Sequence, residues 1–218
     1  FALVYSGNYV FEAQVNDDLG GGLRVNMGLG TTQDMSWHLK EGEVFNTPEA
    51  VLVRSAQGLG GVSRTLHSLY LECLIPQTWA DHNPPILLST WEAKLSSINH
   101  ASTMEMARQA KFIGVNLIVL DDGWYKSKNN ETLGFGDWIV DETKFPKGLK
   151  GIADELNDIG LKFGLWLDPE VTYEDSDLCR QHPDWYFHIP GRTRQMLGRN
   201  QYLLDLTRPD VRDHVVET

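Results

Sequence analysis

The chain has 218 residues, 41% of them hydrophobic, with a formal net charge of −11 at pH 7 and a pI near 5.0. This negative charge argues against nucleic acid or an anionic membrane as a partner, and no apolar stretch approaches the roughly 18 residues of a membrane span. Two distant cysteines, Cys73 and Cys179, do not make a disulfide scaffold, and they favour a cytoplasmic location over an extracellular one.

The first part of the chain alternates apolar and polar residues as β-strands do. The alternating runs are residues 9–15, 23–29, 35–39 and, more briefly, 50–54. Gly-rich or polar turns such as residues 17–22 separate them, and a helical pattern follows at about 63–74. Short strands at close spacing predict part of a β-sandwich, with a helical segment after it.

A polar, Pro-rich stretch at residues 79–85 marks a domain boundary. After it, three apolar runs alternate with helical periodicity: residues 86–88, 116–120 and 162–165. The first helix is expected to begin at a capping box, Ser102-Thr103-Met104-Glu105, and Gly114 and Gly160 are expected to end the two helices. Repeated βα units predict parallel strands, in either a doubly wound sheet or a (β/α)8 barrel. With only about three such strands, a barrel would be incomplete.

Acidic residues and tryptophans follow these apolar runs. Trp91 comes after the first run, Asp121-Asp122-Gly123-Trp124 after the second, and Trp166 after the third. The carboxyl ends of such strands are where ligands bind in α/β folds. Carboxylates accept hydrogen bonds from hydroxyl groups, and indole faces stack on the C–H bonds of sugars. The pattern therefore predicts a sugar-binding site.

Each of these residues also has an ordinary structural interpretation. Neighbours on a strand point to opposite faces. Asp121 and Asp122 therefore suit two hydroxyls of one sugar better than the paired carboxyls of a retaining glycosidase, about 5–5.5 Å apart. They could equally form a solvated acidic loop or cap a turn. A metal site is not indicated, because no further His or acidic residue lies at ligand spacing. Trp138 and Trp185 could pack loops, and Arg199 taken alone is a surface residue.

Other classes of site find little support. Residues 58–63, Gly58-Leu59-Gly60-Gly61-Val62-Ser63, lie between a predicted strand and a predicted helix, as a dinucleotide loop would. The third glycine and the acidic strand end of that motif are missing. The seven His residues show no H-E-x-x-H spacing and there is no G-x-S-x-G elbow, so zinc hydrolysis and serine acyl transfer are not indicated.

A longer series of motifs runs through the chain. In order, it is Ser89-Thr90-Trp91-Glu92-Ala93, Leu120-Asp121-Asp122-Gly123-Trp124, Gly136-Asp137-Trp138, Pro146-Lys147-Gly148-Leu149, Phe163-Gly164-Leu165-Trp166 with Asp168-Pro169-Glu170, His182-Pro183-Asp184-Trp185, and Gly198-Arg199-Asn200-Gln201 with Leu204-Asp205. This series resembles the family 36 glycoside hydrolases, the α-galactosidases. The resemblance implies that residues 1–80 are the C-terminal part of an N-terminal β-sandwich domain plus its helical linker. It also implies that residues 81–218 form the first three βα units of a catalytic (β/α)8 TIM-type barrel.

The resemblance also implies roles for individual residues. Asp121 and Asp122 would hold galactose hydroxyls, including the axial O4, while Trp91 and Trp166 line the sugar subsite. Arg199 would reach in from the loop after the third strand. No cofactor and no metal are implied. Where the family has Trp-Phe-Glu-Pro-Glu-Met, this chain has Trp166-Leu167-Asp168-Pro169-Glu170-Val171, and the shorter Asp168 is not expected to contact the ligand.

The activity implied is that of a retaining α-galactosidase acting on oligosaccharides such as raffinose or melibiose. The family's nucleophile and acid/base would lie beyond residue 218. Because the chain opens at Phe1 without an initiator Met and ends in a helix-like pattern from residue 210, we expect the chain to be an inactive fragment. A homo-oligomer is one possible state of the parent protein. The alternatives are an α-N-acetylgalactosaminidase, a galactosyl transferase like raffinose or stachyose synthase, and a non-catalytic galactose-binding fragment.

Overall fold

The computed structural model describes the chain except for residues 17–19, 31–35, 127–134 and 194–196. It divides into two compact units, residues 1–83 and 84–218. Among the helices of the described residues, none has the length and apolar character to cross a bilayer.

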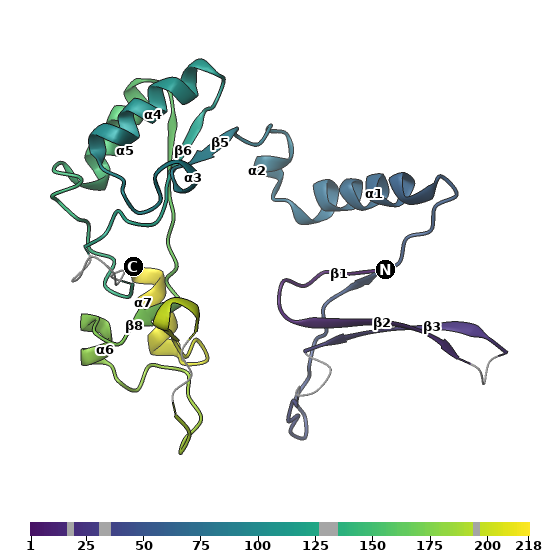
Figure 1. Ribbon diagram of the computed structural model, residues 1–218. Coiled ribbons are helices and arrows are strands. Elements are labelled where there is room, and N and C mark those ends of the chain that lie inside the picture. The colour runs from purple at the N-terminus through teal and green to yellow at the C-terminus, as the bar shows by residue number, and fades with distance from the viewer. Residues whose placement is uncertain (17–19, 31–35, 127–134, 194–196) are drawn as a thin grey trace. The chain divides into compact units, whose positions relative to one another are not determined.

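The first unit contains two small antiparallel sheets (Figure 1). Strands β2 (Tyr9–Asn16) and β3 (Gly22–Leu29) form a hairpin in which Phe11 lies opposite Met27. Both strands are where the alternation predicted them, although residues 17–19 of the connecting turn are outside the described part of the chain. Strand β1 (Ala2–Leu3) pairs with β4 (Ala50–Val51), so the strand predicted at 50–54 is shorter than expected. A β-sandwich stays a prediction.

Two predictions for this unit need correction. Residue 35 of the predicted strand 35–39 lies outside the described residues, and residues 36–39 are not in a strand. The helix expected at 63–74 begins earlier, as α1 (Gly58–Leu69), and continues as the π-helical segment η2 (Tyr70–Leu74) before α2 (Gln77–Ala80). The stretch weighed as a dinucleotide loop is therefore the first turns of a helix. A Cβ on buried Gly61 would lie 2.1 Å from the Ser55 hydroxyl, so close packing requires this glycine.

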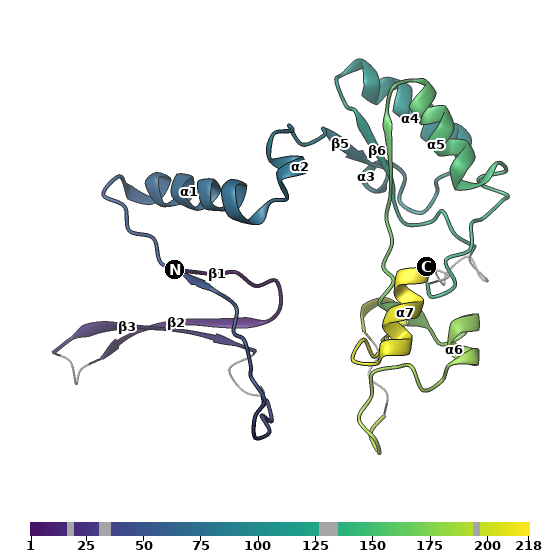
Figure 2. The same cartoon turned by 180° about the vertical axis from the view of Figure 1, so that it is seen from behind.

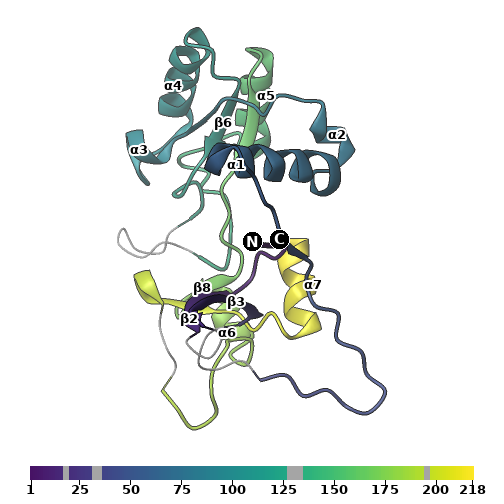
Figure 3. The same ribbon diagram turned by 90° about the vertical axis from the view of Figure 1, so that its right-hand side faces the viewer.

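The second unit is built on a parallel three-stranded sheet, in the order β5 (Leu87–Ser89), β6 (Leu117–Leu120) and β7 (Lys162–Leu165). This confirms the three predicted strands and their parallel pairing. The intervening helices α4 (His100–Phe112) and α5 (Gly148–Asp158) contact each other and are neighbours in Figures 1 and 3.

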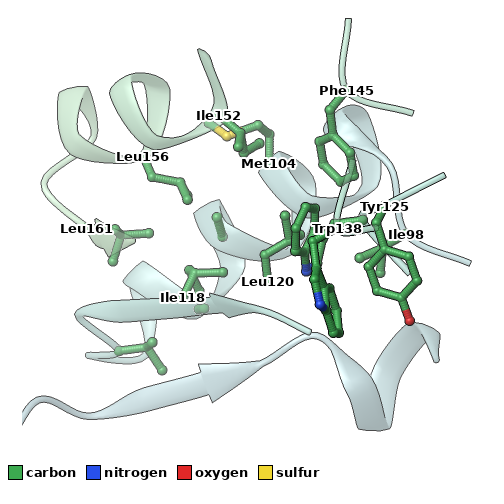
Figure 4. Packing of buried hydrophobic residues seen from close by; sticks show 14 of the residues in the cluster. Ile98, Met104, Ile118, Leu120, Tyr125, Trp138, Phe145, Ile152, Leu156 and Leu161 are labelled. Carbon is green, nitrogen blue, oxygen red and sulfur yellow. The ribbon is translucent and has the colours of Figure 1, made fainter. Parts of the chain in front are cut away.

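The core of this unit lies between the sheet and these helices. Figure 4 shows Ile118 and Leu120 pointing from β6 toward Met104, Ile152 and Leu156. Four of these side chains are fully buried, and Met104 is 4% exposed. The central strand is apolar at every position. Ile118 and Leu120 are buried against the helices, Leu117 and Val119 on its other face are only partly buried, and the strand pairs with a neighbour on each side. The ends of the three strands are thereby held in fixed register.

The ends of α4 and α5 set where the chain enters the next strand. Each helix is followed by a glycine with positive φ, Gly114 at +94° and Gly160 at +77°. The next N–H reaches back to Ala110 or Leu156, which is the Schellman arrangement and confirms both predicted stops. The predicted N-cap is wrong, because Asn99 is the cap of α4 and Ser102 is its third residue. The Asn99 side chain accepts from the Ser102 N–H, and the Ser102 hydroxyl accepts from the Asn99 N–H.

After β7 the chain does not continue directly into another βα unit (Figure 2). It forms β8 (Val171–Tyr173), α6 (Asp177–Gln181), the short turn η3 (Gly198–Asn200), β9 (Gln201–Leu203) and α7 (Pro209–Glu217). β8 and β9 pair antiparallel, a pairing that the sequence did not indicate. A second apolar cluster, which includes Trp185, Tyr186 and Val211, supports this segment.

Candidate functional site

A cavity of about 350 Å³ is lined by residues from the carboxyl ends of β5, β6 and β7. The structure brings all five predicted site residues to this one cavity, although they come from four separate stretches of sequence. Ser89 and Glu92 also line it, although neither was predicted as a site residue. The lining residues are Ser89, Trp91, Glu92, Asp121, Asp122, Trp166 and Arg199.

Asp121 is held between the ends of β5 and β6. Its Oδ2 accepts a hydrogen bond from the Ser89 hydroxyl at 2.7 Å, and its Oδ1 accepts from the Asp122 N–H at 2.8 Å. Its own N–H donates to the Thr90 hydroxyl at 3.0 Å. A carboxylate has about four acceptor positions, so this half-buried group keeps acceptor capacity for a ligand while its orientation is fixed.

The Asp122 carboxylate is directed differently. The residue is 1% exposed. Its Oδ1 accepts from the Tyr125 hydroxyl, and its Oδ2 accepts from Nη1 of Arg199 at 2.9 Å. A buried charge is costly unless it is paired and hydrogen-bonded, and here each oxygen has a donor. The two neighbouring carboxylates therefore turn to different partners, as expected for consecutive residues at a strand end.

Tyr125 is a site residue that the sequence did not reveal. Burial raises the pKa of its phenol well above the ordinary value, and the hydrogen bond to the Asp122 carboxylate raises it further. The hydroxyl therefore remains a proton donor across the physiological range. It reaches Asp122 because the chain turns at Gly123, where φ is +105° and a Cβ would lie 2.7 Å from the Ser96 backbone. Sequence spacing alone does not show such a turn.

Arg199 reaches the cavity from a turn of unusual backbone. Arg199 and Asn200 have φ values of +60° and +57°, a left-handed conformation that few residues other than glycine adopt. The guanidinium pairs with Asp122 and lies 5.4 Å from the centre of the Trp91 ring, within the range of a cation–π interaction. Its side chain is 47% exposed, so it remains accessible from solvent.

A third acidic residue lies near this charge cluster. Burial raises the pKa of the Asp168 carboxyl, and the neighbouring Glu170 raises it further, while Arg199 lowers it. Asp168 is not among the lining residues of the cavity. The carboxyl groups around Arg199 thus extend beyond the pair that the sequence indicated.

The tryptophans divide between the cavity and the core. Trp91 opens the short helix α3 (Trp91–Lys94), Trp166 follows β7, and both are half-buried. Trp124 and Trp138 are 2% and 9% exposed in the first apolar cluster, and Trp185 belongs to the second. Of the five, Trp91 and Trp166 alone line the cavity.

Chemically, the cavity offers fixed acceptors, one cation and two indole faces. This combination suits a neutral polyhydroxylated ligand, which needs several directed hydrogen bonds beside apolar surface. Within the part of the chain that the structure describes, no group of three or more His, Cys, Asp or Glu side chains has the arrangement of a metal site. A larger hollow of about 610 Å³, lined by Ile98, His100 and Lys144 among others, has no carboxylate or indole in its lining. Ser89 could have been found from the sequence, since it ends β5 as Asp121 follows β6.

Comparison with known proteins adds an independent line of evidence. The family model described as Melibiase matches residues 44–218. Alpha-galactosidase AgaA of Geobacillus stearothermophilus is 45% identical over 218 residues, covering 100% of this chain and 29% of that protein. Alpha-galactosidase Mel36A of Lactobacillus acidophilus is 41% identical over 217 residues, with 100% and 29% covered.

Solved structures agree with this. The crystal structure of AgaA matches with a TM-score of 0.90 at 44% identity, covering 99% of this chain and 30% of that one. A variant of AgaA crystallised in complex with raffinose matches with a TM-score of 0.89 at 43% identity, again covering 99% and 30%. The chain therefore spans less than a third of the length of these relatives.

Proposed function

Because this chain belongs to the Melibiase family, whose similar solved structures are family 36 glycoside hydrolases, we propose that its parent protein is a retaining α-galactosidase. It removes terminal α-linked galactose from oligosaccharides such as raffinose or melibiose through a glycosyl-enzyme intermediate. The observation that supports this most directly is the cavity in which Trp91, Asp121, Asp122, Trp166 and Arg199 meet.

In this proposal the cavity recognises the galactosyl ring. Asp121, fixed by Ser89, accepts hydrogen bonds from sugar hydroxyls. Asp122 and Arg199 form a paired acceptor and donor for a further hydroxyl, and the indoles of Trp91 and Trp166 cover the C–H faces of the ring. A site that pairs each hydroxyl discriminates against epimers, because the wrong hydroxyl leaves a buried polar group without a partner. No cofactor is required.

The same proposal assigns the two units. The parallel sheet with α4 and α5 is the first part of a (β/α)8 barrel, in which sites lie at the carboxyl ends of the strands. The antiparallel strands of the first unit are part of a β-sandwich. Asp121 and Asp122 are adjacent and tied to different partners, so we assign neither the role of nucleophile or acid/base. Those roles fall to residues outside these 218.

The test is kinetic and uses the full-length protein. Asp121→Asn keeps the shape of the side chain but removes its charge, so hydroxyl donors lose a charge-assisted bond. We expect kcat/KM on raffinose and melibiose to fall about tenfold or more. The matched control is Asp154→Asn, at a 58% exposed side chain that pairs with Lys150 on α5, and it should leave the kinetics unchanged. Equal kinetics for the two variants would contradict the proposed site.

Two further assays separate the alternatives. Products formed from raffinose and activity on an N-acetylgalactosaminide distinguish hydrolysis of galactosides from galactosyl transfer and from N-acetylgalactosaminidase activity. Turnover by the isolated 218-residue chain would show that our location of the catalytic residues is wrong. Galactose binding without turnover by the full-length protein would leave the site in place and refute the hydrolase.

A further inference from the structure

The indole of Trp124 lies in the core, although it belongs to the motif that supplies Asp121 and Asp122. The residue is 2% exposed. Its ring stacks on Trp138 with centroids 6.0 Å apart and planes inclined by 27°, and it meets Tyr125 edge-on at 5.3 Å. A side chain enclosed in this way does not line the cavity, so it can act on a bound ligand only through another residue.

One directed contact connects Trp124 to the cavity. Its indole N–H donates to the backbone carbonyl of Trp166 at 2.9 Å, and Trp166 is the residue whose indole forms one wall of the cavity. On the other side of the same residue, the Trp166 N–H donates to the Leu120 carbonyl at 2.9 Å. Both backbone groups of Trp166 are therefore held from the segment that ends β6 and carries the carboxylates.

Ring contacts hold the same residue from the side. Trp138 stacks on Trp124 and meets the Trp166 ring at 6.1 Å and 66°. Trp138 itself has φ +45°, a backbone region that a non-glycine residue keeps only where its surroundings impose it. Trp124, Trp138 and Trp166 thus form one packed group, and the Trp124 N–H supplies its directional bond to the Trp166 backbone.

We propose that Trp124 is a positioning residue, which fixes the Trp166 wall relative to the Asp121 and Asp122 carboxylates. It does not contact the ligand. The turn that carries Asp121 and Asp122 thus also fixes, through the Trp124 indole, the position of the Trp166 ring. The apolar face of the sugar packs against that ring. The inference rests on the proposed function in taking a galactosyl ring as the ligand, whereas the positioning itself can be tested separately.

The test removes the N–H and keeps the ring. In the full-length protein, Trp124 is replaced by benzothienylalanine, in which sulfur takes the place of the indole N–H. We expect KM for an α-galactoside to rise by up to about fivefold, the limit reached if the whole worth of one neutral hydrogen bond, about 1 kcal/mol, is lost from binding. The value of kcat should change less than about twofold, because a wall that binds ground state and transition state alike affects KM. In protein labelled with fluorotryptophan, the Trp166 resonance should shift.

The matched control is the same replacement at Trp185, which is 8% exposed and packs in the second apolar cluster. Equal KM values for the two variants, together with an unmoved Trp166 resonance, would overturn the proposal. If the unaltered protein hydrolyses no α-galactoside, the proposed function fails and the Trp166 resonance alone decides the positioning role. If the benzothienylalanine protein does not fold, Trp124→Phe is read out in the same way, and an unmoved Trp166 resonance there refutes the role.

Discussion

Replacing Gly123 by Ala tests whether the turn after Asp122 needs its close approach to the neighbouring loop. Gly123 has φ +105°, and a Cβ would lie 2.7 Å from both Cα and O of Ser96. These are backbone atoms, which cannot rotate away. The left-handed backbone costs about 1–2 kcal/mol, and the steric overlap adds about 1–3 kcal/mol. We therefore expect a loss of about 2–5 kcal/mol in the free energy of unfolding.

Gly114→Ala is the matched control, because Gly114 has a similar φ of +94° and open space around its Cβ position. It should lose only the backbone contribution of about 1–2 kcal/mol. Urea unfolding can be followed in the near-ultraviolet circular dichroism of the stacked Trp124–Trp138 pair, which reports on the second unit. Equal unfolding free energies for the two variants would show that Ser96 does not press on this turn, and the reasoning would be refuted.

Three further changes have defined outcomes. Tyr125→Phe removes only the hydroxyl that donates to buried Asp122. The free energy of unfolding should fall by about 1.5–3 kcal/mol, as expected for the loss of a hydrogen bond to a charged group. An unchanged urea midpoint would argue that this bond is absent in solution. Asn99→Ala should cost about 1 kcal/mol by removing the cap of α4, measured by thermal unfolding; no loss would place the helix start elsewhere. The hydrogen bond from Arg208 lowers the pKa of Asp210 from its ordinary 3.8 to about 2. The resulting stability is present above about pH 4 and is lost as pH falls toward 2. Arg208 also pairs with Asp184 and lowers the pKa of that carboxyl. Arg208→Gln should therefore flatten the acid-unfolding profile over this interval, and an identical profile would exclude both pairs as its source.

The sequence was sufficient for the parallel sheet and for much of the site. Hydrophobic runs of the right length, with Gly114 and Gly160 between helix and strand, are local signals that tertiary contacts do not override. Asp121, Trp91 and Trp166 could be assigned to a common edge because parallel strands deliver their carboxyl ends to the same side. Arg199 is different, because its position alone indicates a surface residue. Only the resemblance to a family placed it at the site.

Other features depend on contacts that a linear pattern does not contain. The early start of α1 runs against the low helix propensity of Gly58, Gly60 and Gly61. Of these, Gly61 alone packs closely against Ser55, a contact that the linear pattern does not show. The cap of α4 moved to Asn99 because two side chains exchange hydrogen bonds there. The antiparallel pairing of β8 with β9 joins segments about thirty residues apart, and neither segment carries a turn signal that would predict its partner.

The bond between Arg199 and Asp122 spans 77 residues of sequence and has a consequence for the order of assembly. The entropic cost of closing a loop grows with its length, whereas the helices and the β2–β3 hairpin close over short separations. In refolding, we expect far-ultraviolet signals of helix to recover before the long-range contact forms. The assembled cavity, and with it the proposed binding of a sugar, would then be the last property to return, and its appearance would mark the completion of the fold.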